Sequence, residues 1–328
     1  MQRVALVGAG GMGATHAASY GKIQNAKLVA VMDIRPDAAA DLAAHYNAKS
    51  FSDAQKMFDE VEFDIIDICT PTPWHIDYVK IGAAAGKHVC CEKPFGRTLE
   101  QCREAIEACE KAGVTLFIAH VLRWFPEFKK AKELIDFGAI GSPAVVRTTR
   151  GGGFPHGWNN WFANFEWSGG AVLDLVIHDF DWLLWTFGPA ERVFAKGLYN
   201  SGIPEKDYAL ITIRFRSGVI AHVEATFATP GGFKVSLEVA GDKGVINFDN
   251  TDAAPLVIGK WQTESSGPGV PVPSSPMSVS PYYLELQHFV DCIEEGRKPA
   301  VTPQEAMDAV ALALAAIESI KTGAPVRL

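Results

Sequence analysis

The chain has 328 residues, enough for two ordinary domains, and its 48% hydrophobic and 21% charged residues are typical of globular proteins. Its formal net charge is -8, with no cluster of basic residues, which argues against nucleic-acid binding. No apolar stretch is long enough to span a membrane, and the first residues enter a strand pattern at residues 3–7 rather than a signal-peptide pattern. We therefore expect a cytoplasmic protein without nucleic-acid or membrane partners.

The first 120 residues alternate short apolar runs with helix patterns. One helix, expected at residues 99–111, starts with the capping-box pattern Thr98 to Gln101 and stops before Gly113. Apolar strands that alternate with helices predict a parallel sheet covered on both faces, and so an α/β, doubly wound Rossmann domain over residues 1–121. The expected strands are residues 4–7, 28–32, 65–69, 89–91 and 114–119, and a further helix is expected at 38–46.

After about residue 140 the strand patterns follow one another, with turn sequences at 217–218 and 241–244. This order predicts an α+β domain with an open, mostly antiparallel sheet over residues 122–328. Residues 262–281 are rich in Pro, Ser and Gly and predict a long loop. Two helices follow at 283–295 and at about 303–322; Thr302 to Glu305 caps the second, which we expect to pack back toward the Rossmann domain. The expected strands are 144–149, 193–199, 208–215, 219–227, 234–240 and 245–248.

The six cysteines do not have the spacing of a metal site or of a disulfide framework. Cys90 and Cys91 are neighbours in an expected strand, so their side chains point to opposite faces and are poorly placed to pair. We therefore expect free, buried thiols and no metal.

The turn after the first strand has the sequence Gly8-Ala9-Gly10-Gly11-Met12-Gly13. In a dinucleotide-binding turn the first glycine permits the tight bend, the second lets the backbone approach the pyrophosphate, and the third allows close packing of helix and strand. A helix-compatible stretch at 14–22 follows, and its N-terminus would present unpaired N–H groups to the phosphates. We expect the loop residues Gly8, Gly10, Gly11, Met12 and Gly13 to bind the cofactor.

Asp33 ends the second strand, twenty residues after Gly13, where a carboxylate would accept hydrogen bonds from the adenosine ribose. Its charge would repel a 2′-phosphate, which favours NAD over NADP. Arg35 lies two positions further and offers a phosphate a partner, so NADP stays possible. We include Ile34 between them in the expected cofactor site.

Ligands of open α/β sheets bind at the carboxyl ends of the strands, and two such ends carry conspicuous residues. A Pro-rich turn follows the third strand, and a charged pair follows the fourth. We expect these residues to contact the cofactor: Thr70, Pro71, Thr72, His75, Glu92 and Lys93. Taken alone, Lys93 would be interpreted as an ordinary solvated lysine at a strand end.

A helix is expected over residues 169–181, and Asp174, His178 and Asp181 fall on one of its faces at i, i+4 and i+7. Its other residues are mostly apolar, so the helix should be buried. Buried acidic and imidazole groups cost free energy unless they are hydrogen-bonded or used in chemistry. An internally satisfied pair of Asp174 and His178 is the alternative.

The glycine loop, the Glu92-Lys93-Pro94 sequence and the Asp174-x-x-x-His178 spacing together resemble the glucose–fructose oxidoreductase/inositol dehydrogenase/rhizopine-catabolism (Gfo/Idh/MocA) family over essentially the whole chain. The resemblance implies that Lys93 binds the reacting hydroxyl and that His178 is the general base in oxidation and the general acid in reduction. It implies that Asp174 binds substrate and orients His178, and that Pro94 forms a cis-type turn that aims Lys93. It also implies a homodimer or homotetramer formed through the C-terminal sheet.

Two positions depart from the family's commonest pattern. Val176 stands where Gly is frequent, and the segment at His120 continues through Val121 to Arg123 where Asn is frequent. The second departure leaves the polar contacts of the substrate pocket open, and we include Arg123 among the expected substrate-binding residues, with Lys93, Asp174 and His178.

An aromatic stretch at residues 154–167 precedes the expected helix of Asp174. Aromatic faces and amides suit the C–H surface and hydroxyls of a polyol, which makes His156, Asn160 and Trp161 candidate substrate contacts. Packing, or contact with another subunit, is the competing interpretation, since Trp is enriched at interfaces.

These features predict an NAD(P)-dependent dehydrogenase that interconverts a secondary alcohol and a ketone on a sugar, a sugar acid or an inositol by hydride transfer to or from nicotinamide C4. Two alternatives remain. One is a glycoside hydrolase of the same fold that uses NAD transiently. The other is a nicotinamide-sensing regulatory protein, which would not need Lys93, Asp174 and His178 together.

Overall fold

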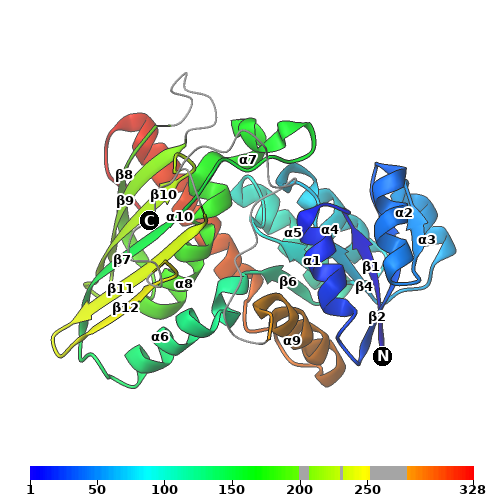
Figure 1. Cartoon of the computed structure of the whole chain (residues 1–328), viewed down its shortest axis with the longest axis horizontal. Helices are drawn as coiled ribbons and strands as arrows, with labels where there is room; N and C mark the ends of the chain where they lie inside the picture. The colour runs from blue at the N-terminus through cyan, green and yellow to red at the C-terminus, as the bar shows by residue number, and fades with distance from the viewer. Residues whose placement is uncertain (199–206, 230–231, 252–278) are drawn as a thin grey trace. The chain divides into compact units, whose positions relative to one another are not determined.

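The computed structural model describes residues 1–198, 207–229, 232–251 and 279–328. The chain divides into two compact units: one comprises Met1–Trp124 with Ser274–Met307, and the other comprises Phe125–Pro273 with Asp308–Leu328. Among the described residues, no helix is both long and apolar enough to cross a membrane. Each unit is built around its own sheet (Figure 1).

The sheet of the first unit has six parallel strands in the order β3-β2-β1-β4-β5-β6, which confirms the predicted Rossmann fold. The central strands are almost wholly buried because their residues are apolar on both faces. The short, exposed third strand was not predicted, because its three residues carry no apolar run. The strands are β1 (Gln2–Val7), β2 (Ala26–Met32), β3 (Lys49–Phe51), β4 (Ile65–Ile68), β5 (His88–Glu92) and β6 (Leu116–Ala119).

Helices α1 and α9 of this unit pack together, as do α4 and α5. Helix α5 has the predicted capping box, in which Thr98 and Gln101 each bond the other's backbone N–H, and it ends at Gly113 in the left-handed conformation. The helices are α1 (Gly11–Tyr20), α2 (Pro36–His45), α3 (Ala54–Glu60), α4 (His75–Ala84), α5 (Leu99–Ala112) and α9 (Pro281–Glu295), with the 3₁₀ turns η1 (Thr72–Trp74) and η2 (Val121–Trp124).

The second unit contains a seven-stranded, mostly antiparallel sheet in the order β12-β11-β7-β10-β9-β8-β13. Strand β7 runs parallel to β10 and separates it from β11, while the other strand pairs are antiparallel, as predicted for most of the sheet. Two expectations extend outside the described residues: residue 199 of one expected strand and residues 262–278 of the expected loop. Helix α9 begins at Pro281, two residues before the expected start at 283. The strands are β7 (Pro143–Gly151), β8 (Ala190–Gly197), β9 (Tyr208–Phe215), β10 (Ile220–Thr226), β11 (Lys234–Gly241), β12 (Val245–Asp249) and β13 (Val326–Arg327).

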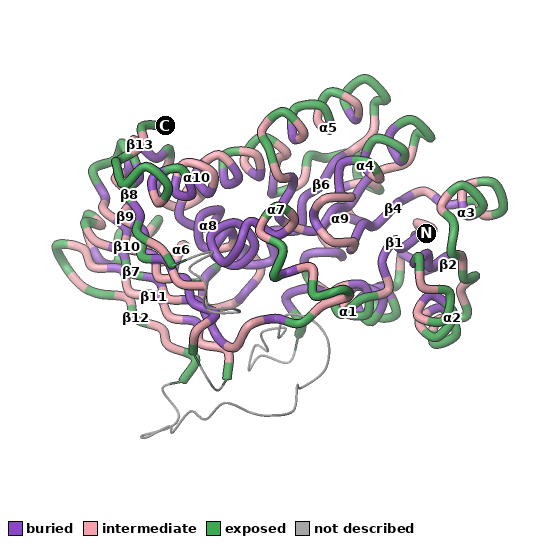
Figure 2. Tube along the Cα trace, turned by 90° about the horizontal axis from the view of Figure 1, so that it is seen from above, coloured by how far each residue is buried: buried purple, intermediate pink, exposed green. Residues whose placement is uncertain are grey.

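Along these strands buried and accessible residues alternate, so one face of the sheet is covered and the other is open. Figure 2 shows α8 buried along most of its length beside this sheet. Helix α10 begins in the first unit and continues in the second, and Thr302 and Glu305 form its predicted capping box. The remaining elements of this unit are α6 (Pro126–Asp136), η3 (Trp158–Ala163), α7 (Phe165–Ser168), η4 (Ala171–Leu175), α8 (Ile177–Phe187) and α10 (Pro303–Thr322).

Candidate functional site

The glycine turn at the end of β1 has the geometry that its sequence predicts. Gly8 has φ +103°, a left-handed value, and a Cβ at this position would lie 2.6 Å from the carbonyl oxygen of Cys69. A Cβ on Gly13 would lie 1.9 Å from the carbonyl oxygen of Gly8, so α1 can start this close to β1 only with glycine there. A Cβ on Gly10 would meet nothing within 4 Å. The space beside Gly10 is therefore open for a ligand.

Helix α1 starts at Gly11, with Gly10 as its N-cap, and its first turn contains no acidic side chain. The first N–H groups of a helix have no partner within the helix, and they carry the positive end of its dipole. Gly10 and Gly11 are exposed and Met12 is half-buried, so this end is accessible. The turn therefore fits a pyrophosphate.

Asp33 lies directly after β2 and is almost buried, with 7% of its surface exposed. Its Oδ2 accepts the backbone N–H of Ala9 at 2.7 Å, and its two oxygens accept three hydrogen bonds from Arg35 at 2.9 Å. Burial alone would raise the pKa of Asp33, but the bonds from Arg35 and Ala9 hold the pKa below its ordinary value. The carboxylate is therefore charged at neutral pH, while Ile34 next to it is exposed.

The register of the parallel sheet aligns the strand ends of this unit. Val7 of β1 pairs with Ile68 of β4, and Ile68 pairs with Cys91 of β5. The residues that follow these strands therefore leave the sheet at one edge, as the sequence predicted. They include the glycine turn, the Thr70–Pro71 segment and the Glu92–Lys93 pair.

His75 at the start of α4 joins two of these strand ends. Its Nε2 lies 2.8 Å from the carbonyl oxygen of Thr70, and its Nδ1 lies 2.9 Å from the carbonyl oxygen of Pro94. Burial lowers the pKa of His75 below its ordinary value although both carbonyls favour the charged ring. The side chain is buried against backbone carbonyls, and Thr72 beside it is buried as well, whereas Pro71 is half-buried.

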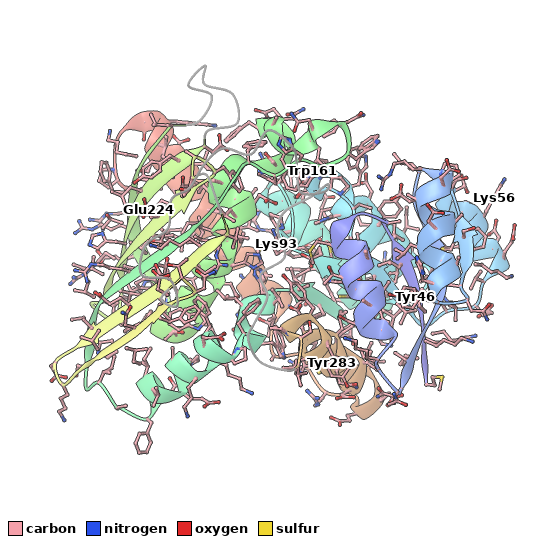
Figure 3. The ribbon with its side chains drawn as sticks, in the orientation of Figure 1. Tyr46, Lys56, Lys93, Trp161, Glu224 and Tyr283 are labelled. Carbon is pink, nitrogen blue, oxygen red and sulfur yellow. The ribbon has the colours of Figure 1, made fainter. Side chains whose placement is uncertain are left out.

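Lys93 follows β5 and is half-buried, and its peptide bond to Pro94 is cis, as the resemblance implied (Figure 3). The backbone N–H of Lys93 donates to Glu92 Oε2 at 3.0 Å, and Glu92 Oε1 lies 3.0 Å from Nε2 of His16 on α1. His16 was missed by sequence reasoning. The only signal was its place one turn into the cofactor helix, on the side that faces the sheet.

In the second unit the stretch expected as one helix is divided. Residues Ala171–Leu175 form a π-helical turn, Val176 departs from helical geometry, and α8 starts at Ile177. Asp174 is buried in the π turn and His178 is half-buried in the first turn of α8. The prediction of one regular helix over residues 169–181 is therefore wrong, because a π turn, which contains an additional residue, interrupts it. Such turns are frequent at functional sites.

Two acidic residues that sequence reasoning missed hold this segment. Asp207 accepts the backbone N–H of Ala171 at 3.2 Å, and its burial raises its pKa above the ordinary value despite that bond. Asp179 on α8 forms a buried ion pair with Arg150 of β7, with 2.5 Å between Oδ2 and Nε. The outside partners, Asp207 and Arg150, are both distant in sequence from the segment that they contact.

Arg123, an expected substrate contact, is buried in η2. Its Nη1 donates to the carbonyl oxygen of Ala300 at 2.9 Å and lies 3.3 Å from a carboxylate oxygen of Glu305. Of the residues proposed from the aromatic stretch, His156 and Asn160 are exposed. Trp161 (Figure 3) is half-buried, and its ring centroid lies 3.9 Å from that of Phe162. The roles of these residues in substrate binding stay predictions.

The described part of the chain contains six free, buried thiols, as expected. One group of possible metal ligands is present among the described residues, formed by His16, Asp67 and Cys69. The sequence spacing did not indicate this group, because its members come from α1 and from the end of β4.

Residues 2–120 match the family model described as "Oxidoreductase family, NAD-binding Rossmann fold". Residues 132–328 match the family model described as "Oxidoreductase family, C-terminal alpha/beta domain". The chain is 31% identical to myo-inositol 2-dehydrogenase of Thermotoga maritima, over 99% of this chain and 98% of that protein. It is also 31% identical to scyllo-inositol 2-dehydrogenase (NAD(+)) of Bacillus subtilis, over 99% and 96%.

Among solved structures, the chain is similar to the WlbA dehydrogenase from Bordetella pertussis, which was determined in complex with NADH and UDP-GlcNAcA. The TM-score is 0.82 at 25% identity, over 99% of this chain and 98% of that one. The sequence matches and the turn geometry agree that the first unit is an NAD-binding Rossmann domain.

Proposed function

This chain belongs to the Gfo/Idh/MocA oxidoreductase family and is an NAD-dependent dehydrogenase that acts on CH–OH groups. From that premise we propose that it interconverts a secondary alcohol and a ketone on a cyclic polyol or sugar. The observation that carries the proposal is the shared sheet edge in the first unit. The strand register brings the dinucleotide turn and Lys93 to that one edge.

In this mechanism Lys93 holds the reacting hydroxyl, and its positive charge favours loss of the hydroxyl proton. His178 accepts that proton as the C=O bond forms, and returns it in the opposite direction. The buried carboxylate of Asp174 orients the imidazole and binds substrate. Bound NAD would supply the hydride acceptor for the alcohol carbon, and the protein's own residues supply placement and charge.

Asp33 and the glycine turn would hold the cofactor. The charged Asp33 suits the ribose hydroxyls of NAD, and in this structure Arg35 is engaged with the same carboxylate. The other expected contacts of the cofactor are Ile34, Arg35, Thr70, Pro71, Thr72, His75, Glu92 and Lys93. For substrate we retain Arg123, His156, Asn160 and Trp161 as candidates beside the three catalytic residues.

The test is a panel of inositols, aldoses and sugar acids, with NADH and NADPH absorbance followed after addition of NAD or NADP. We expect turnover of at least one cyclic polyol with NAD. Lys93→Ala and His178→Ala should each lower kcat by about 10²–10⁴-fold, the usual contribution of a positioned proton-transfer group, while NAD affinity stays near wild type. Wild-type turnover in either variant would refute the assigned roles.

The same panel separates the alternatives. Release of sugar from a glycoside without net NADH would indicate the NAD-assisted hydrolase. Tight NAD binding without turnover of any compound in the panel would refute the assignment to a cyclic polyol or sugar.

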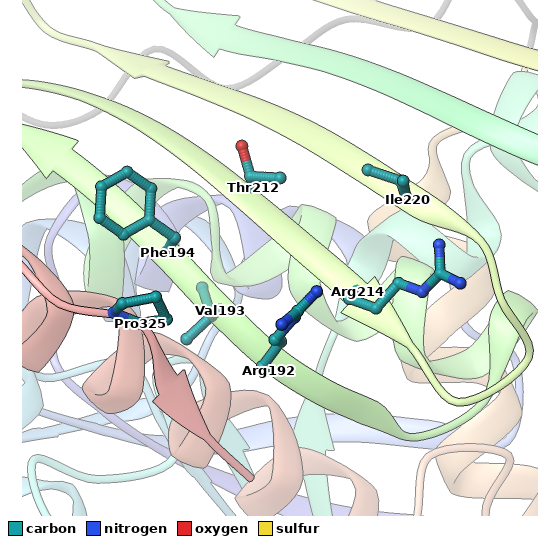
Figure 4. Close-up of a pocket in the computed structure, with 7 residues that line it drawn as sticks. All are labelled: Arg192, Val193, Phe194, Thr212, Arg214, Ile220 and Pro325. Atoms are coloured by element: carbon teal, nitrogen blue, oxygen red, sulfur yellow. The ribbon is translucent and has the colours of Figure 1, made fainter.

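We also propose that the open face of the second unit's sheet joins copies of this chain. The face exposes the large apolar side chains Phe194 and Leu210, while Glu224 lies on it as well (Figure 3). A hollow of about 240 Å³ lies on this face, and none of the expected site residues lines it (Figure 4). Its lining is Arg192, Val193, Phe194, Thr212, Arg214, Ile220 and Pro325. Analytical ultracentrifugation of the wild type and of Leu210→Glu tests the proposal, since a charge on a buried interface should dissociate the oligomer.

A further inference from the structure

His16 lies on α1, one turn beyond the glycine loop, and the proposed mechanism does not use it. Its side chain is fully buried between two carboxylates. Nδ1 lies 2.8 Å from Asp67 Oδ2 at the end of β4, and Nε2 lies 3.0 Å from Glu92 Oε1 at the end of β5. The three residues come from three separate elements of the first unit.

The partners determine the protonation state of His16. A carboxylate only accepts hydrogen bonds, so both ring nitrogens must donate, and the ring is then an imidazolium. Burial alone would lower the pKa of His16, but the charge of Asp67 and its hydrogen bond raise the pKa well above its ordinary value. A neutral ring would leave one buried carboxylate facing a nitrogen lone pair.

Glu92 transmits this contact to Lys93. Its first oxygen accepts from His16, and its second accepts the backbone N–H of Lys93 at 3.0 Å. On the far side of Lys93, the carbonyl of Pro94 is bonded to His75. The main chain that carries the Lys93 side chain is therefore held on both sides by buried groups.

Cys69 completes the cluster. Its Sγ lies 3.3 Å from His16 Nδ1 and 3.7 Å from Asp67 Oδ1, and burial raises the pKa of the thiol. The thiol is thus protonated and can donate to Asp67. The polar atoms of His16, Asp67 and Cys69 therefore make hydrogen-bond contacts directly with one another.

We propose that His16 is a positioning residue, which is held by Asp67, fixes Glu92 through its Nε2 and thereby places Lys93 for reaction. This inference rests on the catalytic role of Lys93 in the proposed function. A positioning role of His16 differs from a purely structural role in one respect. The hydrogen bond to Glu92 determines the placement of Lys93, whereas the hydrogen bond to Asp67 only anchors the ring.

Two substitutions separate these bonds. His16→Gln keeps a donor near the position of Nε2, toward Glu92, and His16→Asn keeps a donor near the position of Nδ1, toward Asp67. We expect His16→Asn to lower kcat by about 10–100-fold, the usual cost of removing an orienting partner, and His16→Gln to lower it much less. The Kd of NAD, measured by fluorescence titration, should stay near wild type in both.

Glu92→Gln is the second route to the same question, in case the histidine variants do not fold. Its amide can accept only one of the two hydrogen bonds, so kcat should fall as in His16→Asn. The matched control is His88→Gln, at the opposite end of β5, where Nδ1 accepts the backbone N–H of Thr115 at 3.1 Å. This variant weakens the same strand far from Lys93 and should keep the wild-type kcat.

A readout without turnover keeps the two proposals distinct. The rate at which acetic anhydride acetylates the Lys93 amine, measured by mass spectrometry, should change in His16→Asn and Glu92→Gln but not in His88→Gln or at the other lysines. If no alcohol in the panel is oxidised, the proposed function fails while this labelling still decides the role of His16.

Equal losses of kcat in His16→Asn and His16→Gln, or losses that follow the melting temperature across all four variants, would overturn the proposal. So would unchanged Lys93 labelling in the folded variants. A stoichiometric metal in the wild type that is lost in His16→Asn would also overturn it, because the ring would then be a ligand.

Discussion

The buried ion pair between Arg150 and Asp179 yields a quantitative prediction for stability. Arg150 is 2% exposed and Asp179 is 0% exposed, and the pair joins β7 of the sheet to α8 directly beside His178. Asp179→Asn keeps the shape of the side chain but leaves the guanidinium charge buried without a counter-ion. Breaking such a pair costs about 3–5 kcal/mol, and about 2–4 °C is lost per kcal/mol in a unit of this size. We expect the melting temperature of the second unit to fall by roughly 6–20 °C.

The assay is thermal unfolding followed by tryptophan fluorescence, since Trp182 is fully buried on the same helix. Asp136→Asn is the matched control: the same chemical change at an i, i+4 pair with Lys132 in which the carboxylate is 58% exposed, where the cost is about 0.3–0.5 kcal/mol. A double variant, Arg150→Met with Asp179→Leu, should recover much of the loss because no unpaired charge remains. If Asp179→Asn has the same melting temperature as Asp136→Asn, the buried pair does not hold α8 and the reasoning fails.

Three further predictions concern the first unit. Asp33→Ser removes the carboxylate that holds Arg35. The kcat/KM for NADP divided by that for NAD should therefore rise about 10–100-fold, the value of one or two hydrogen bonds to a charged group. An unchanged ratio would contradict the role of Asp33 in favouring NAD. Gly13→Ala should destabilise the protein and abolish NAD binding, whereas Gly10→Ala, which has open space, should melt near wild type; equal melting of the two would contradict the packing argument. Burial raises the pKa of Cys102 to about 12, so with rising pH the thiol loses its proton in the unfolded chain before it does so in the folded chain. The free energy of unfolding should therefore fall by about 1.4 kcal/mol per pH unit between the ordinary pKa of a thiol and the raised pKa of Cys102. In urea unfolding between pH 9 and pH 11, Cys102→Ala should lower the slope of the unfolding free energy against pH by about 1.4 kcal/mol per pH unit, while the other buried thiols keep their own contributions; an identical slope would count against a buried Cys102 thiol.

The parts of the fold that the sequence predicted depend on short-range spacing. The glycine turn, the capping box of Thr98 and Gln101, and the turn at Gly218 each need only a few neighbouring residues, and each has the expected geometry. The sheet of the second unit required more. Whether β7 lies between β10 and β11 depends on pairing across about 75 residues, and alternating hydrophobicity does not encode the partner of a strand.

The same distinction applies to the site. Lys93 and His178 are visible in the sequence because they stand in short motifs, whereas His16 makes its contacts with residues 51 and 76 positions away. Asp207 meets Ala171 across 36 positions. A one-dimensional pattern indicates which residues are candidates for the chemistry, but the groups around them come from elements that are distant in sequence, such as α1 for His16. Substitutions of these supporting residues should therefore change kcat with little change in the affinity for NAD, while substitutions in the glycine turn should do the opposite.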